Sequence, residues 1–258
     1  MNFQRALSCR VGGRGLVILA SVGIGALLWE TVYLLSGGIG FAHTWEVGLF
    51  LANAVTSLGF WTSLSLTAFS TLAGLVAGSL LAILMAIPLS RFPYIWQSSR
   101  SFFFFIRSIP SVALLPILLA SLGSRYSLML VLITWLVSTK VLFFAVRGFD
   151  DSEKFYVEQS KLLHLGGVHE FLYVKIPAAS AIILMGLRLT VNRAYGGAVL
   201  GSLLAGIPGI GNEIQLARLT ADYVGVLGLT VAAALLGVAF FQGLRYLETH
   251  TINWRPVA

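Results

Sequence analysis

The sequence contains little cysteine and little charge. Cys9 is its only cysteine, which excludes a disulfide framework and a cysteine-rich metal site. Charged residues make up 10% of the 258 residues, whereas soluble globular domains carry about 25%. Hydrophobic residues make up 57%, and the mean hydropathy is +0.89. Because a lipid bilayer is the solvent that stabilises such a composition, we predict an all-α membrane protein.

Sequence motifs for ATP hydrolysis, nucleophilic catalysis and metal binding are also missing. No segment fits the phosphate-binding pattern G-x-x-x-x-G-K-[ST], so the chain is predicted not to hydrolyse ATP, and the LSGG at residues 35–38 is interpreted as a turn. No G-x-S-x-G nucleophile elbow is present. His164 and His169 are separated by a Gly-Gly break, a spacing that matches no strong metal-ligand pattern. We therefore predict no catalytic residue, no metal site and no cofactor bound by this chain.

Six apolar runs have the length of about 20 residues that a helix needs to cross about 30 Å of hydrocarbon. No internal repeat, low-complexity tail or soluble appendage stands out, so residues 1–258 are predicted to form a single transmembrane domain. The predicted spans are Gly15–Leu35, Ser65–Leu89, Phe102–Leu122, Leu128–Val146, Ala178–Leu204 and Val224–Tyr246.

Basic residues divide unequally between the two sides of these spans. Lys and Arg concentrate in cytoplasmic loops of membrane proteins, and twelve of them fall on one side against Arg125 and Arg218 on the other. Both termini are therefore predicted to be cytoplasmic, with residues 1–14 as a tail. Residues 36–64 are then external, and Trp45 indicates a helix lying at the interface. Because the basic residues form no stripe with interleaved aromatics, no nucleic-acid partner is expected.

Residues 147–177, between the fourth and fifth predicted spans, are the polar part of this hydrophobic chain. Phe155, Glu158 and Leu162 share one face of a predicted helix, at spacings of three and four. The orientation places this segment in the cytoplasm.

A second short helix is predicted within the same segment. Gly166-Gly167 separates it from the first helix, and it covers His169–Lys175. We expect it to end before Pro177, because the residue before a proline is disfavoured in the α region. Pro177 would then mark the turn into the fifth span.

The spacing in this segment resembles a cytoplasmic loop of the inner-membrane subunits of bacterial ABC importers. That loop has the pattern E-A-A, three residues, G, nine residues, I, one residue, L-P. The spacing matches throughout, whereas the two alanines and the glycine are replaced here. The pattern positions are filled by Glu158, Gln159, Ser160, His164, Val174, Ile176 and Pro177. His164 adds bulk where the family keeps the backbone open, and we expect the nearby glycine pair to supply the bend.

Three further runs carry the same resemblance. RSIPSVALLPILLASLG (107–123) is similar to the family's entry into its third span. IPAASAIILMGLRL (176–189) is similar to the run after the cytoplasmic loop, and GIPGIGNEI (206–214) to an external glycine-rich turn. Together these features cover about residues 60–258. They are most similar to the nitrate, sulfonate, taurine and bicarbonate branch of importer permeases.

The resemblance implies a multi-pass permease of the bacterial inner membrane, surrounded by lipid. It implies that the 147–177 loop docks as a coupling helix on separate ATPase subunits, which bind ATP and magnesium. It also implies a second permease copy or homologous permease and an external solute-binding protein. The coupling residues that follow from it are Phe155, Glu158, Lys161, Leu162, His164, Gly166, Gly167 and Pro177.

A polar stripe crosses the predicted fifth span. Arg188, Asn192 and Tyr195 recur at i, i+4 and i+7, and Arg193 flanks them. A charge at that depth costs at least about 2.5–3.5 kcal/mol on insertion scales, so it should face protein or water. The stripe is a candidate lining for the pathway of a small anion. The alternative is structural, with Arg188 paired to an acid such as Glu30 or to backbone carbonyls at a subunit contact.

Glycines on two of the predicted spans indicate close helix packing. Gly74 and Gly78 form a G-x-x-x-G pair on the second span, and Gly196, Gly197 and Gly201 crowd the fifth. Small residues allow neighbouring helices to approach closely.

Two other functional classes remain open. A self-sufficient secondary transporter or channel would typically place membrane acids at an inverted repeat, and Glu30 is the only acid within a predicted span. An intramembrane enzyme would need a catalytic constellation, which the sequence lacks. The resemblance favours a small oxyanion (nitrate, sulfonate, taurine or bicarbonate) as substrate, with a pyrimidine vitamin precursor as the alternative.

Overall fold

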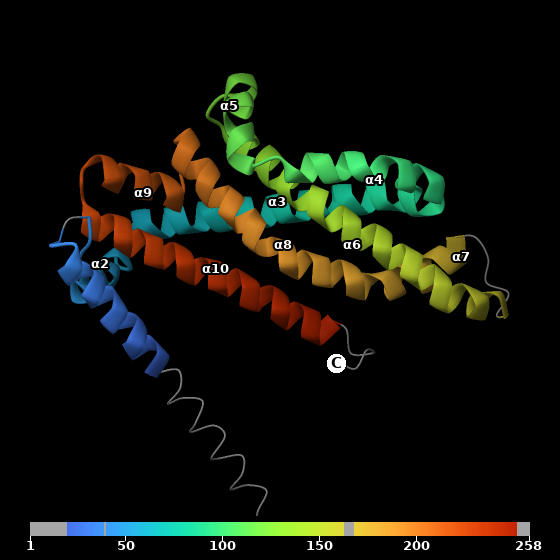
Figure 1. Cartoon of the computed structure of the whole chain (residues 1–258), viewed down its shortest axis with the longest axis horizontal. Helices are drawn as coiled ribbons and strands as arrows, with labels where there is room; N and C mark the ends of the chain where they lie inside the picture. The colour runs from blue at the N-terminus through green and yellow to red at the C-terminus, as the bar shows by residue number, and fades with distance from the viewer. Residues whose placement is uncertain (1–19, 39, 163–167, 252–258) are drawn as a thin grey trace, which may run out of the picture. The chain divides into compact units, whose positions relative to one another are not determined.

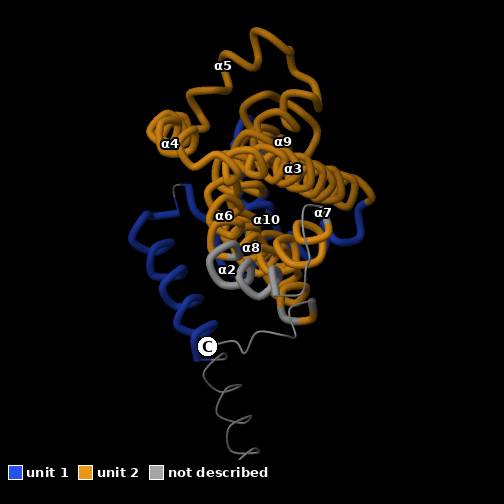
Figure 2. Tube along the Cα trace, turned by 90° about the vertical axis from the view of Figure 1, so that its right-hand side faces the viewer, with its two compact units in different colours: residues 1–57, 216–232 blue, residues 58–215, 233–258 orange. Residues whose placement is uncertain are grey.

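The computed structural model describes residues 20–38, 40–162 and 168–251, and gives the backbone alone for 152–162, Val168, Thr249 and Thr251. The chain divides into two compact units, which Figure 2 colours separately. The smaller unit contains residues 1–57 and 216–232, and the larger contains residues 58–215 and 233–258. The single domain expected over residues 1–258 stays a prediction.

Every described element is a helix, and the described part of the chain contains no β-strand, so the predicted all-α fold is confirmed. A helix at Ala20–Leu35 comes first. It is followed by α2 (Thr44–Ala54), α3 (Leu58–Arg91), α4 (Pro93–Ser108), α5 (Ser111–Leu122), α6 (Tyr126–Leu162), α7 (Val168–Glu170), a π-helix (Phe171–Lys175), α8 (Ile176–Ala205), α9 (Ile210–Leu219) and α10 (Tyr223–Thr251).

Among the described residues, four helical segments are long and apolar enough to cross a membrane. They coincide with the predicted second, fourth, fifth and sixth spans and are Leu58–Arg91, Tyr126–Asp151, Phe171–Ala205 and Tyr223–Glu248. The bent pair α4 and α5 makes a fifth if it is taken as one span. The predicted first span is described from Ala20 to Leu35, and Gly15 lies outside the described residues. The prediction of about six spans and the orientation of the termini stay predictions.

The third predicted span, Phe102–Leu122, is a broken helix rather than a continuous one. α4 ends at Ser108 and α5 begins at Ser111, and the two helices are bent by 84° (Figure 1). Pro110 has no N–H to donate and disfavours helical backbone at the residue before it. Ile109 is accordingly extended, with φ −66° and ψ 124°. The 12 residues of α5 reach about 18 Å, too short to cross a bilayer alone.

In the larger unit, α6 packs against both α3 and α8 (Figure 1) and supplies most of the large side chains that are fully buried. The glycine pair of α3 permits this approach. A Cβ atom at Gly74 would lie 2.4 Å from Cγ2 of Ile133, and one at Gly78 would lie 2.6 Å from Cβ of Val137. Both distances are shorter than van der Waals contact, so α3 could not lie this close to α6 with larger residues at these positions.

The glycines of α8 divide into two kinds. A Cβ at Gly197 would lie 2.7 Å from Cδ1 of Leu136, and one at Gly201 would lie 3.0 Å from Cγ of Met129. A Cβ at Gly196 would meet nothing within 4 Å. Close packing is therefore confirmed for Gly197 and Gly201, as for the α3 pair, whereas Gly196 borders open space.

The glycine-rich turn after α8 is bonded to the first turns of α3. Gly206 takes the left-handed conformation that ends α8, with φ 64° and ψ 27°. The Ile210 N–H donates to Oγ1 of Thr67 at 2.9 Å, and Oγ of Ser63 donates to Oε1 of Glu213 at 3.1 Å. These bonds fix the turn to α3 at its end nearer Leu58.

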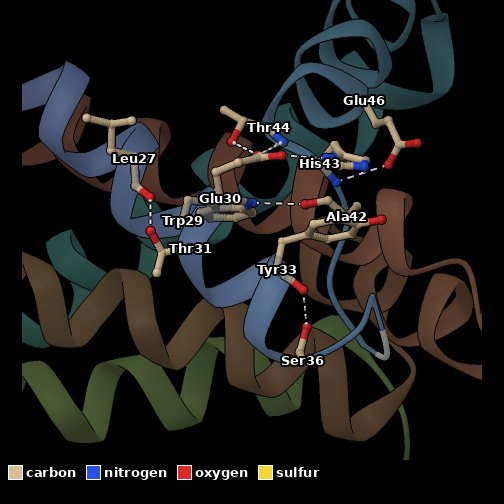
Figure 3. Close-up of polar contacts among 10 residues, drawn as sticks. All are labelled: Leu27, Trp29, Glu30, Thr31, Tyr33, Ser36, Ala42, His43, Thr44 and Glu46. Carbon is tan, nitrogen blue, oxygen red and sulfur yellow. Dashed lines mark hydrogen bonds and ion pairs between the residues drawn. The ribbon is translucent and has the colours of Figure 1, made fainter.

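In the smaller unit, a polar cluster joins the N-terminal helix to the beginning of α2 (Figure 3). Oε1 of Glu30 lies 2.5 Å from Nδ1 of His43. Its other oxygen accepts bonds from the N–H and the hydroxyl of Thr44 at 3.3 and 3.1 Å. Nε1 of Trp29 donates to the carbonyl of Ala42 at 3.0 Å. Glu30 is thus the acceptor that holds these two helices together.

Candidate functional site

The polar segment begins as an extension of the fourth span. α6 has 37 residues and is about 55 Å long, well beyond the roughly 30 Å of hydrocarbon. The helix therefore continues past Val146, where the predicted span ends, to Leu162. The predicted coupling positions on this extension are Phe155, Glu158, Lys161 and Leu162. His164, Gly166 and Gly167 lie outside the described residues.

The chain enters α8 without the turn that was predicted at Pro177. A π-helix covers Phe171–Lys175, and the Ile176 N–H donates to the Phe171 carbonyl five residues back. Pro177 occupies the first turn of α8, and both Lys175 and Ile176 have helical backbone. The prediction that the helix ends before Pro177 is therefore wrong. In a regular α-helix, proline clashes with the carbonyl four residues before it. The wider π turn ahead of Pro177 is one physical reason why the helix can continue through this proline.

One face of this π-helix is anchored and another is open. Phe171 stacks on Phe149, which is 3% exposed, with ring centroids 5.8 Å apart. Nζ of Lys175 lies 3.7 Å from Oε1 of Glu170. Tyr173, in contrast, is 72% exposed. The element is thus held against α6 while it presents an aromatic side chain outward.

Two of the four pathway candidates on α8 form side-chain bonds to α10 within the larger unit. Nη1 of Arg188 lies 3.0 Å from Oε2 of Glu248, and its guanidinium lies 5.2 Å from the ring of Phe241. The hydroxyl of Tyr195 donates to the Ala233 carbonyl at 2.6 Å. Arg188 has the acid partner that the structural alternative requires, and that acid is Glu248. Both side chains join α8 to α10.

The other two candidates, Asn192 and Arg193, are exposed. Arg193 borders a cavity of about 340 Å³ between the α4–α5 break, α6 and α8. Arg107 lines the same cavity, and no Asp or Glu is among the described residues that line it. The cavity is therefore positively charged. Its remaining lining residues are Ser108, Ile109, Pro110, Ser111, Trp135, Leu136, Thr139, Gly196, Gly197 and Leu200.

The polar stripe on α8 pointed to Arg193 as a pathway residue, but Arg107 and the α6 residues Trp135 and Thr139 were missed. Arg107 begins the RSIP run, and the proline in that run was the available signal that the helix breaks beside it. Only the folded chain shows that this break faces α8. In the described part of the chain, no group of three His, Cys, Asp or Glu residues could hold a metal ion.

These observations define a multi-pass membrane protein with a charged cavity between its helices and a long helical extension beyond one span. Residues 78–253 match the family of binding-protein-dependent transport system inner membrane components. Since the match covers more than half of the chain, the protein belongs to that family. It is a permease subunit of an ABC transporter in the inner membrane.

Individual relatives agree with this assignment. A probable ABC transporter permease protein of Brucella abortus (strain 2308) is 26% identical over 259 aligned residues, 98% of this chain and 100% of that protein. The nitrate import permease protein NrtB of Leptolyngbya laminosa is 26% identical over 189 residues, 67% of this chain and 65% of NrtB. The crystal structure of an amino acid ABC transporter with histidines shares the fold, with a TM-score of 0.63 at 18% identity. That likeness covers 78% of this chain and 98% of the solved one.

Proposed function

We propose that this permease forms the pathway of an ATP-driven importer for a small oxyanion such as nitrate, a sulfonate, taurine or bicarbonate. The observation that carries the proposal is Arg193, an exposed guanidinium in a cavity that no described acidic side chain lines. An uncompensated cation within a membrane span is costly and marks an ion or substrate pathway. The similarity to the nitrate permease NrtB supports the same class of substrate.

The coupling segment supplies the second half of the proposal. Residues 147–177 dock on separate ATPase subunits, which bind ATP and magnesium, so the chain itself needs no cofactor. The α6 extension and the anchored π-helix support this role, because a docking element transmits force only if it is rigidly joined to the spans behind it. A second permease, identical or homologous, completes the pathway, and an external binding protein delivers the solute.

Reconstitution tests the whole assignment. The permease, its ATPase and its binding protein are placed in liposomes, and ATP hydrolysis and uptake are measured with nitrate, taurine, bicarbonate and an uncharged pyrimidine. We expect an oxyanion to stimulate both activities. Stimulation by the pyrimidine alone would contradict the substrate class. Uptake by the permease without its ATPase would instead identify a secondary transporter or channel.

Substitution of the two exposed residues tests the pathway directly. Asn192→Leu combined with Arg193→Leu removes the polar groups while keeping side chains of membrane-compatible size. We expect uptake to fall while the ATPase still co-purifies with the permease. Normal uptake kinetics in the double variant would remove these residues from the pathway.

A further inference from the structure

Arg107 is a cation held by aromatic rings and not by an acid. It lies in the last turn of α4 and is half-buried. Its guanidinium lies 5.4 Å from the ring centroid of Phe143 and 5.8 Å from that of Phe104. Among the described residues, no carboxylate forms an ion pair with it. A guanidinium that stacks on rings keeps its N–H donors available for a ligand.

A second cavity, of about 460 Å³, adjoins Arg107 between α4 and α6. Arg107 lines this cavity and the 340 Å³ cavity that contains Arg193. The first cavity holds two cations and no acid among its described lining residues, a formal charge of +2. The second holds Arg100, Arg107, Lys140, Arg147, Asp150 and Asp151, four cations less two acids, again +2. Both cavities therefore attract anions.

The amino end of α5 borders the first cavity. Ser111 is the first residue of α5 and lines the cavity beside Pro110. The first N–H groups of a helix have no partner within the helix and carry partial positive charge. The hydroxyls of Ser108 and Thr139 donate to backbone carbonyls of their own helices, so they contribute acceptors. The cationic side chains that line the cavity are thus Arg107 and Arg193, and the amino end of α5 lies beside them.

We infer that Arg107 is the transfer group of the pathway, that is, the side chain that passes the anion from the first cavity to the second. A small oxyanion binds in the first cavity between Arg107 and Arg193, and then passes around the Arg107 guanidinium into the second cavity, toward Lys140. The planar fork of arginine binds two oxygens of an oxyanion at once. Because aromatic rings hold it, the guanidinium can keep one oxygen while it releases the other, and no protein ion pair has to break. This role rests on the proposed function and specifies which residue moves the substrate.

Trp135, which lines the first cavity, provides a readout that does not depend on transport. The assembled complex is reconstituted in phosphatidylcholine nanodiscs, and tryptophan fluorescence is quenched with iodide or with neutral acrylamide. The contribution of Trp135 is the difference between the wild type and a Trp135→Phe variant. We expect iodide to quench Trp135 efficiently, and nitrate to protect it.

Arg107→Gln should at least halve the iodide quenching of Trp135, leave acrylamide quenching unchanged and reduce uptake about tenfold. Lys140→Gln should reduce uptake but leave iodide quenching of Trp135 unchanged, because Lys140 lines only the second cavity. The matched control is Arg91→Gln, which removes the same charge from an exposed position at the end of α3 and should alter neither measurement.

Three results would overturn the inference. If Arg107→Gln retains both iodide quenching and uptake, Arg107 is not the transfer group, although the oxyanion importer would stand. If phosphatidylglycerol abolishes the quenching while nitrate does not, a lipid headgroup occupies the site. If the complex transports only an uncharged solute while nitrate still protects Trp135, the proposed function fails and the transfer role fails with it.

Discussion

At the scale of single residues, some glycines of α8 permit close helix packing, whereas another lines the proposed pathway. Gly196 lines the 340 Å³ cavity, and a Cβ there meets nothing within 4 Å. A Cβ at Gly186, on the same helix, would lie 2.6 Å from both Cβ and Cγ of Phe144. The same substitution should therefore impair transport at Gly196 and stability at Gly186.

Gly196→Leu should fold normally, because leucine favours helix over glycine and the side chain enters open space. We expect uptake to fall about tenfold, equivalent to about 1.4 kcal/mol in the barrier to passage. Gly186→Leu should instead destabilise the protein by about 1–3 kcal/mol through overpacking. Uptake assays and thermal unfolding in detergent measure the two effects. Wild-type uptake by Gly196→Leu would show that solute does not use this cavity.

Arg188 can be assigned by a double-mutant cycle with Glu248. Its ion pair is only partly exposed, with 32% and 22% of the two side chains accessible. Arg188→Gln and Glu248→Gln should each destabilise the protein by roughly 1–3 kcal/mol, between the values for exposed and buried pairs. The double variant should cost less than the sum of the two. If the two destabilisations are additive and only Arg188→Gln loses uptake, Arg188 would be assigned to the pathway and not to the ion pair.

At the scale of elements, the break between α4 and α5 shapes the first cavity, because Ser108 to Ser111 line it. In a Cys9→Ser background the chain has no cysteine, so spin labels at Ser101→Cys and Ala120→Cys report only on this pair. Nineteen residues of continuous helix would separate these positions by about 28 Å, whereas the 84° bend brings them within roughly 20 Å. Pro110→Ala should shift the measured distances toward the longer value and lower uptake. An unchanged distance would show that packing, and not the proline, sets the bend.

The same elements show what the sequence could predict. Apolar runs of bilayer length predicted α3, α6, α8 and α10, because hydrocarbon thickness fixes how many residues a span needs. Pro110 in the third run was a signal for a break, because proline has no N–H to donate, but the 84° angle could not be read from the sequence. Pro177 was misjudged for a related reason: the preceding residues widened into a π-helix, and no periodic pattern predicts that.

At the scale of the whole molecule, partners distant in the chain decided the functional assignments. The stripe Arg188, Asn192 and Tyr195 was predicted correctly as a helical face, yet its members differ in role because α10 covers only some of them. Glu248 lies 60 residues beyond Arg188, and that pairing depends on the register between two helices. Arg107 and Arg193 meet at one cavity for the same reason. Motif spacing, in contrast, led to the family without any tertiary information.

The assembled complex provides the last prediction, which concerns the coupling segment. Glu158 lies on the α6 extension, at the first position of the loop pattern. Glu158→Lys reverses a charge in the surface expected to dock on the ATPase, while the spans keep their sequence. We expect normal membrane insertion and retained basal ATP hydrolysis, but at least a tenfold loss of uptake per ATP hydrolysed. Glu153→Lys, a matched change on the same helix outside the pattern, should remain coupled. Equal uptake per ATP in both variants would show that this extension is a solvated helix with no part in driving transport.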